Sequence, residues 1–159
     1  MKFLVPLLLT LPISATEPLT SSANISLVPI PAGSFTIGSP DSEKGRSRDE
    51  AQRKVDITAP FHMAATEITQ KQWADVMGTT FEDLINKQRG PVGRGANLAS
   101  TPSAIGDDQP MCFVNWSDAV EFCKTLTKKD RTANIISPTF VYKLPTEAQW
   151  EYACRAGTT

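Results

Sequence analysis

Prolines and glycines interrupt this sequence at short intervals and limit the length that any helix or strand can reach. The 159 residues include 12 Pro and 9 Gly. Proline removes a backbone donor and glycine weakens the interior of a helix or strand, so long regular elements are disfavoured. The pattern favours one loop-rich domain over a helical bundle, and the chain length is that of a single domain.

The charge balance and the residue counts exclude several classes of function. The chain has 16 Lys and Arg against 17 Asp and Glu, for a net charge of -1. No global attraction to nucleic acid or to an acidic membrane surface follows from that balance, and we expect no nucleic-acid partner. One His and three Cys leave little material for a closed zinc site, which needs four nitrogen or sulfur ligands.

The N-terminal residues 1–15 are typical of a secretory signal peptide. Lys2 precedes a short apolar run over residues 3–13, and Ser14 and Ala15 supply small residues for cleavage. The run is too short to cross a bilayer of about 30 Å as a helix, and no later stretch approaches that length. We expect a mature protein that begins near Thr16 and is secreted or periplasmic, without a membrane span. The alternative is a buried N-terminal strand or helix.

Export changes the interpretation of the cysteines, because thiols tend to pair in an oxidising compartment. The chain has three cysteines, Cys112, Cys123 and Cys154, and an odd number cannot all pair with one another. At least one of them is therefore free, bonded to another chain, or waiting for a partner outside this sequence. The chain has no C-x-x-C spacing, which argues against a thioredoxin-like or zinc-ribbon domain.

Short strands are predicted in the first half of the domain and again near the end. The segment 26–37 predicts two strands around a Pro-Ala-Gly turn, with Phe35 and Ile37 on one face. A charged loop follows over residues 40–54. Further strands are expected at residues 55–58, 61–64, 111–114 and 140–144.

Three helices are predicted from capping residues and apolar periodicity. In two of them a Thr is followed three residues later by a Gln, a pair that satisfies free N–H groups reciprocally. The third is expected to begin at Ser117 and to end before a polar connector over residues 128–138. The predicted boundaries are Thr69 to Gly78, Ser117 to Leu126, and Thr146 to Gly157, with another turn or two at residues 81–86 and a loop at 88–106.

Three groups of side chains are candidates for chemistry, and each has a structural interpretation. Glu147 and Glu151 lie four residues apart and are a possible catalytic carboxylate pair. We favour helix-dipole stabilisation for Glu147 and an ion pair with Arg155 for Glu151. His62 stands in an apolar run and is interpreted as structural. An exposed trio of Trp73, Trp116 and Trp150 would stack on sugars or bases, but core packing is favoured.

Four segments, taken together, resemble the motifs of the formylglycine-generating enzyme, or sulfatase-modifying-factor, family. They occur in the family's order. The departures are Asn115 for the usual Ser, Lys143 for the usual Arg, and Ala156 for a Gly. The segments are residues 30–39 (IPAGSFTIGS), 67–73 (EITQKQW), 110–119 (PMCFVNWSDA) and 143–157 (KLPTEAQWEYACRAG).

The resemblance implies a single α+β domain of C-type-lectin-like fold over residues 27–159. The segment before it, residues 16–26, begins with a Ser/Thr/Pro-rich stretch and is expected to be a linker. The resemblance implies oxidation of a sulfatase cysteine to Cα-formylglycine, with an extended cysteine-containing peptide of a sulfatase as partner. In the family, the copper-binding cysteine pair and the calcium ligands lie downstream of the fourth motif. The resemblance therefore places no catalytic, cofactor-binding or metal-binding residue in this chain, which would be an N-terminal portion, inactive alone.

The resemblance also suggests roles for two thiols. Cys123 and Cys154 match positions that form disulfides with downstream cysteines in some relatives. A non-catalytic module that binds protein or glycan on the lectin-like scaffold is the alternative function. A relative that inserts sulfur beside an iron-binding domain is a third possibility, against which the single His and the signal peptide argue.

Overall fold

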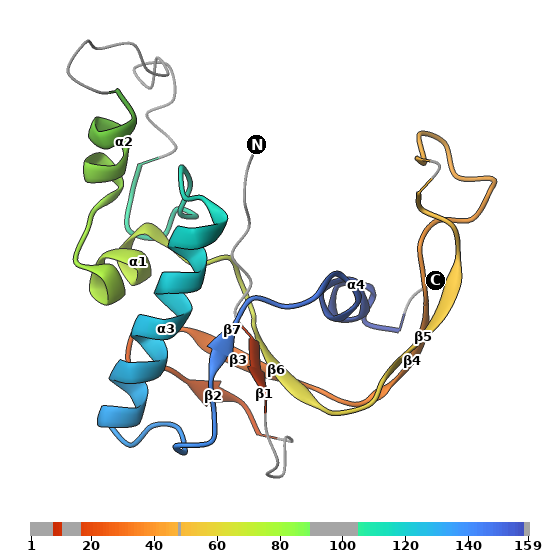
Figure 1. The fold of residues 1–159 in the computed structure, drawn as a ribbon, viewed down its shortest axis with the longest axis horizontal. Coiled ribbons are helices and arrows are strands. Elements are labelled where there is room, and N and C mark those ends of the chain that lie inside the picture. Colours follow the sequence, from red (N-terminus) through yellow and green to blue (C-terminus); the bar gives the residue numbers. More distant parts are fainter. Residues whose placement is uncertain (1–7, 11–16, 48, 90–104, 158–159) are drawn as a thin grey trace.

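The computed structural model describes residues 8–10, 17–47, 49–89 and 105–157. These residues form four helices and two antiparallel sheets, connected by loops. Figure 1 shows the larger sheet beside the first three helices, and the smaller sheet curving away from it as an arm. The predicted loop-rich α+β architecture is confirmed.

The larger sheet has five strands, and its outer strands are short. Their order across the sheet differs from their order in the sequence because the N-terminal strand inserts between two later ones. The order is β2 (Leu19–Thr20), β3 (Ser26–Ile30), β6 (Phe61–Ala64), β1 (Leu8–Thr10) and β7 (Tyr142–Lys143).

The smaller sheet is a two-stranded hairpin of β4 (Gly33–Ile37) and β5 (Arg53–Ile57). Its register runs from Gly33 opposite Ile57 to Ile37 opposite Arg53. Phe35 and Ile37 lie on one face, as the alternation predicts: Phe35 is half-buried and Ile37 is buried. The charged loop between the two strands lies at the far end of the arm (Figure 1).

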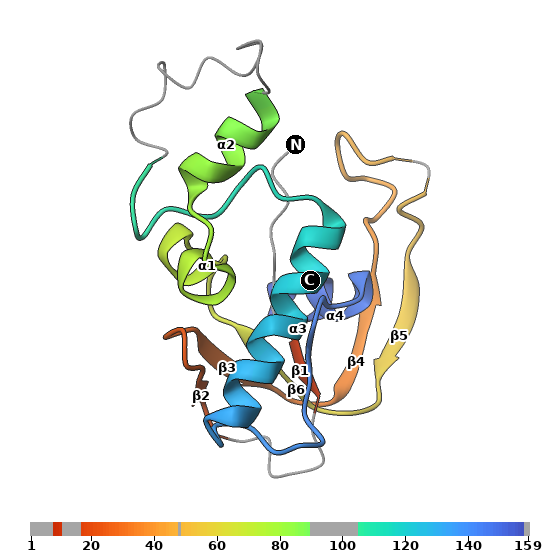
Figure 2. The same ribbon diagram turned by 60° about the vertical axis from the view of Figure 1, so that its left-hand side comes forward.

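Three helices enclose the larger hydrophobic core. They are α1 (Gln70–Met77), α2 (Phe81–Arg89) and α3 (Trp116–Thr132). In Figure 2, α1 lies beside the first half of α3, and α2 continues beyond α1. The largest fully buried side chain is Trp73, whose ring stacks on Phe122 at a centroid distance of 5.2 Å.

The fourth helix, α4 (Glu147–Arg155), packs on the hairpin instead of on the larger core. Ala148, Tyr152 and Ala153 join a second, smaller apolar cluster together with β4 and β6 residues. In Figure 1, α4 lies on the concave side of the curved arm. None of the helices in the described part of the chain combines the length and apolar character that crossing a bilayer requires.

The helix predicted from Ser117 to Leu126 starts earlier and ends later than the sequence indicates. Its N-cap is Asn115, not Ser117, because Asn115 and Asp118 form a reciprocal capping box with N–H to oxygen distances of 2.9 and 3.0 Å. Residues 128–132, predicted as connector, continue the helix to Thr132. The long helix brings Asp130 and Arg131 beside the segment that leads into β7.

The strand predicted at residues 111–114 is wrong. A single bridge joins Thr69 to Pro110, and no strand follows it in this described segment. Phe113 has a φ of 61°, in the left-handed region that extended backbone does not occupy. The strand predicted at 140–144 shortens to β7, and most of the predicted loop 88–106 lies outside the described residues.

The segment that precedes β3 contributes to the larger core. Residues 17–26, predicted as a linker, contain β2 and a turn with Asn24 at a φ of 55°. Ala23 and Ile25 are buried in the core. This segment is therefore part of the domain. The pairing of β1 with β6 and β7 corresponds to the buried-strand alternative for the N-terminus, and signal-peptide cleavage stays a prediction.

Candidate functional site

The four motif segments pack against each other in two pairs that are distant in the sequence. The first motif forms β4, and the fourth forms α4, which packs on it. Tyr152 from α4 contacts the hairpin with its ring 5.3 Å from that of Phe35. A Cβ atom at Gly33 would lie 2.4 Å from the Tyr152 hydroxyl oxygen. Glycine at this position therefore leaves the space that the tyrosine occupies.

A second contact within this pair holds the end of β4 to α4. The Glu151 carboxylate accepts a hydrogen bond from the Gly38 N–H at 3.0 Å. The same carboxylate accepts from Arg155 Nε at 2.8 Å, and Arg155 Nη2 donates to the Gly38 carbonyl at 3.0 Å. The predicted Glu151–Arg155 ion pair is confirmed. Both side chains of the ion pair also bind the backbone of Gly38, a contact that the local spacing does not reveal.

The second and third motifs form the other pair. The Met111 N–H donates to the Ile68 carbonyl at 2.8 Å, next to the bridge between Thr69 and Pro110. Trp73 from the second motif reaches α3, where it stacks on Phe122. The Trp73 indole N–H is also satisfied, by Thr79 Oγ1 at 3.1 Å. This tryptophan is a core residue, as predicted.

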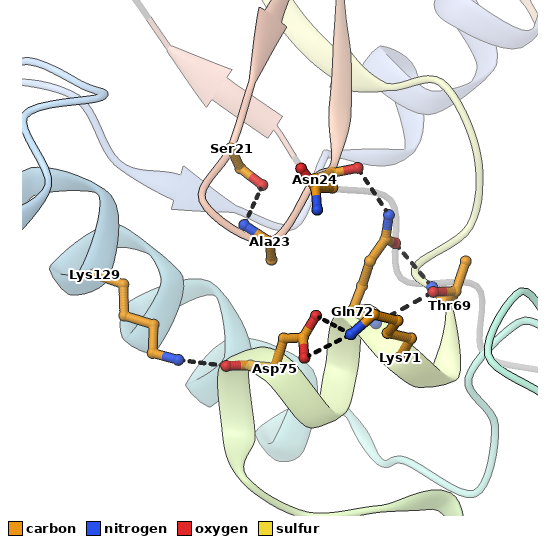
Figure 3. Close-up of polar contacts among 8 residues, drawn as sticks. All are labelled: Ser21, Ala23, Asn24, Thr69, Lys71, Gln72, Asp75 and Lys129. Carbon is orange, nitrogen blue, oxygen red and sulfur yellow. Dashed lines mark hydrogen bonds and ion pairs between the residues drawn. The ribbon is translucent and has the colours of Figure 1, made fainter.

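Polar contacts anchor α1 between the β2–β3 turn and α3, as Figure 3 shows. Gln72 completes the predicted capping box by accepting from the Thr69 N–H at 3.0 Å. Its side-chain amide also donates to the Asn24 carbonyl at 3.2 Å. On the other side of α1, Lys129 donates to the Asp75 carbonyl. Thus Thr69 and Gln72 fix the position of a helix and have a structural role.

Asp130 is fully buried and links three parts of the fold. Its carboxylate accepts from the Ser22 backbone N–H at 3.1 Å and from the Ser22 hydroxyl. It also accepts from the Tyr142 hydroxyl at 2.7 Å. Burial and the adjacent Asp130 carboxylate raise the pKa of Tyr142. These polar groups are hydrogen-bonded within the domain, which is how a buried charge is accommodated.

The three cysteines stand in different environments. Cys112 is half-buried before α3, Cys123 is buried inside α3, and Cys154 is exposed on α4. Burial raises the pKa of the Cys123 thiol from an ordinary 9.0 to about 12. Copper is bound by thiolate, and burial of Cys123 makes loss of the thiol proton to a metal more costly. The cysteines present do not fit the copper pair that the family resemblance implies.

The other candidates for chemistry also occupy structural positions. His62 is 3% exposed, and its Nε2 lies 2.8 Å from the Glu17 carbonyl oxygen. Glu147 stands in the first turn of α4, where a negative charge suits the helix dipole. In the described part of the chain, no group of three or more His, Cys, Asp or Glu side chains is placed to hold a metal ion.

Two of the three tryptophans are exposed, which contradicts the prediction that all three are core residues. Trp116 is 69% exposed and Trp150 is 42% exposed. Trp116 is the first residue of α3, whose buried face starts at Ala119. Trp150 points away because α4 uses Ala148 and Tyr152 against the hairpin. The outer face of α4 therefore carries Trp150 and the exposed Cys154.

The comparisons with known proteins converge on one family. The family described as "Sulfatase-modifying factor enzyme 1-like domain" matches residues 14–159. The formylglycine-generating enzyme of Bos taurus is 27% identical over 168 residues, which cover 82% of this chain and 40% of that protein. The inactive Cα-formylglycine-generating enzyme 2 of Bos taurus is 25% identical, covering 87% of this chain and 52% of that protein.

Two further similarities lie outside these enzymes. The chaperone protein LppX of Paenibacillus barcinonensis is 28% identical, covering 61% of this chain and 36% of that protein. The structure of PvdO from Pseudomonas aeruginosa aligns with a TM-score of 0.62 and 28% identity, over 89% of this chain and 53% of that chain. The chain thus spans about two fifths to one half of the length of most of these relatives. The C-type-lectin-like fold prediction agrees with this alignment.

Proposed function

Because the chain belongs to the sulfatase-modifying factor enzyme 1-like family, we propose that it supplies scaffold for a formylglycine-generating domain and has no cysteine-oxidising activity by itself. The proposal rests on the structural role of the motif residues. Tyr152, Glu151, Thr69 and Trp73 all hold elements of the fold together. These four motif side chains are engaged in packing, capping and the contact between β4 and α4.

The state of the cysteines supports the same proposal. The family resemblance implies that a copper-binding cysteine pair carries out the oxidation of the target cysteine. Cys123 is enclosed in the core with a raised pKa, whereas Cys154 is exposed on a different helix. The substrate that the family implies, an extended cysteine-containing peptide of a sulfatase, would therefore find scaffold here but no reactive thiol pair.

An activity assay tests the proposal. The purified chain is incubated with a sulfatase-motif peptide, copper and oxygen, and the peptide is analysed for aldehyde by mass spectrometry after hydrazide capture. We expect no aldehyde above a reaction without protein. A formylglycine-generating enzyme assayed in parallel controls for the quality of the peptide and the copper. Aldehyde formation by the chain alone would overturn the proposal.

Export through residues 1–15 is a second part of the proposal. The family match begins at residue 14, close to the predicted cleavage site before Thr16, which supports it. Cleavage would remove β1 from its place between β6 and β7. N-terminal sequencing of the protein recovered from an exporting host should start near Thr16. An intact Met1 would favour the alternative of a buried N-terminal strand.

A non-catalytic binding module is the second candidate function. The exposure of Trp116 and Trp150 favours it, because aromatic side chains at a surface suit contact with protein or glycan. One relative bears the name of an inactive enzyme and another that of a chaperone. Glycan-array binding that is lost on Trp116→Ala would support this function, and an array with no signal would count against glycan as the ligand.

A further inference from the structure

A groove runs between the second half of α3 and the strand that borders it, away from the motif contacts described above. Its volume is about 420 Å³, within the range of binding sites for small ligands and side chains. Figure 1 shows β7 beside α3 at this place. The lining residues are Lys124, Thr127, Lys128, Arg131, Thr132, Val141 and Tyr142.

The groove has a strongly one-sided charge. Three of its lining side chains are cationic, and none of these described lining residues carries a carboxylate. The nearby Asp130 carboxylate is buried and accepts hydrogen bonds from Ser22 and Tyr142. Glu121 pairs with Lys124 at 3.4 Å on the exposed surface, an interaction of little strength. Among the described residues, the cations that line the groove therefore outnumber the carboxylates paired with them.

The helix dipole does not account for all of these charges. Cations stabilise the last turn of a helix, where Lys129 and Arg131 stand. Lys124 lies two turns earlier, beyond the reach of that effect. Lys129, on another face of α3, is committed to the Asp75 carbonyl of α1. Lys124 and Lys128 instead both line the groove, and both residues are exposed.

The groove is shaped for side chains and not for the addition of a β-strand at Tyr142. β7 is the last strand of the sheet, but the Tyr142 N–H donates to Thr127 Oγ1 at 2.9 Å. This hydroxyl covers a backbone donor that an edge strand would otherwise offer to a partner. Arg131 is fixed at the groove wall by donating from Nε and Nη2 to the Phe140 carbonyl, at 3.1 and 2.6 Å.

The spacing of the cations matches an extended acidic chain. At a rise of about 1.5 Å per residue, Lys124 and Lys128 are separated by about 6 Å along α3, and Arg131 lies about 4.5 Å further. Alternate residues of an extended peptide are about 6.6 Å apart and point to the same side. Val141, 37% exposed, gives the groove an apolar side for the remaining contacts.

We propose that the groove between α3 and β7 docks an extended acidic segment of a protein partner, with carboxylates at alternate positions facing Lys124 and Lys128. The proposal is independent of the proposed scaffold function. It uses a different surface from the motif contacts, and no enzymatic activity enters its test.

A labelled peptide tests the proposal. The probe is a fluorescein-labelled peptide of alternating Glu and Val, titrated with the 159-residue chain by fluorescence polarisation. A peptide of alternating Gln and Val is the comparison ligand. We expect the Glu peptide to bind at least about tenfold more tightly than the Gln peptide, and its Kd to rise as salt increases from about 50 to about 500 mM.

Matched variants locate the binding. Lys124→Glu with Lys128→Glu should weaken binding of the Glu peptide by about tenfold or more. Lys44→Glu with Lys54→Glu changes the net charge equally on the distant arm, where both lysines are exposed, and should change binding less than about threefold. Lys124→Gln with Lys128→Gln gives an intermediate loss. Circular dichroism of each variant checks that the fold is retained.

Several results would overturn the proposal. Equal weakening by the groove pair and the arm pair would mean that net charge alone governs binding. Equal affinity for the Glu and Gln peptides would mean that the carboxylates are not recognised. Tighter binding of single-stranded RNA or polyphosphate than of the Glu peptide, lost in the groove variants, would assign the groove to another class of ligand.

Discussion

Ala156 has a backbone conformation that its Cβ atom disfavours. It caps α4 with a φ of 46° and a ψ of 37°, in the left-handed region. A residue with a Cβ atom pays about 1–2 kcal/mol for this conformation, whereas glycine adopts it freely. The sequence predicts Gly157 as the cap, and Gly157 also has a positive φ, of 84°, one residue later.

We therefore predict that Ala156→Gly raises the free energy of unfolding by about 1 kcal/mol. The measurement is urea denaturation followed by circular dichroism. Ala153→Gly, inside the same helix and packed in the smaller cluster, is the matched control and should lower the stability by about 1 kcal/mol or more. If both substitutions destabilise equally, the left-handed cap is not a source of strain.

The buried thiol of Cys123 predicts a loss of stability in alkali. Its pKa is raised to about 12 in the folded chain from an ordinary 9.0, so the unfolded chain loses its proton first as pH rises. Between these two values the folded chain binds more protons, and its stability falls as pH increases. The stability that the folded chain gains from the raised pKa of Cys123 is fully present below pH 9.

Denaturation at a series of pH values from about 8 to about 10 measures this effect. The wild-type chain should lose stability over that range, and Cys123→Ala should show a shallower dependence from a lower starting stability, because the substitution leaves a cavity. Tyr142, whose pKa is also raised, adds to the loss at higher pH in both proteins. Parallel profiles for the two proteins would contradict the assignment to Cys123.

At the scale of elements, α4 and the β4–β5 hairpin share a small apolar cluster with residues of β6. α4 has no buried residue among its nine positions, and the cluster it joins is much smaller than the one around α3. Elements with little buried apolar surface open at lower free energy than the core. The Glu151, Arg155 and Gly38 contacts hold α4 and the hairpin together as a unit.

We predict that this unit unfolds before the rest of the domain. In native-state hydrogen exchange, backbone amides of α4 and β4 should exchange faster than those of α3 at every denaturant concentration. Glu151→Gln, which weakens the contact with Arg155, should accelerate exchange in the unit and leave α3 unchanged. Equal exchange rates in the two regions would show a single cooperative core instead.

For the whole molecule, the sequence predicts the features that depend on neighbouring residues. The capping boxes at Thr69 and Thr146 are both confirmed because each needs a pattern only four residues long. The sequence does not locate the N-cap of α3, because Ser117 and Asn115 are both good N-cap residues and only the hydrogen bond from the Asn115 N–H to Asp118 decides between them. The resemblance to a known family identified the fold that local patterns leave open.

Features that depend on distant contacts were not predictable in this way. Trp150 fits the apolar face of an isolated helix, but the hairpin that α4 meets selects Tyr152 instead. The sequence does not reveal the groove, because the polar residues 128–138 predict a connector, whereas the helix continues to Thr132 and brings Lys128 and Arg131 next to Val141. No sequence pattern signals a contact between Gly33 and Tyr152.

The contact between Gly33 and Tyr152 tests directly whether the family motifs in this chain pack against each other as scaffold. A double-mutant cycle measures the unfolding free energies of wild type, Gly33→Ala, Tyr152→Phe and the double variant. Gly33→Ala alone should cost roughly 1–3 kcal/mol through the clash with the Tyr152 hydroxyl. In the Gly33→Ala background, Tyr152→Phe should recover at least about half of that cost. This corresponds to a coupling free energy of about 1 kcal/mol between the two positions. Strictly additive losses would show that the two motifs do not depend on each other at this contact.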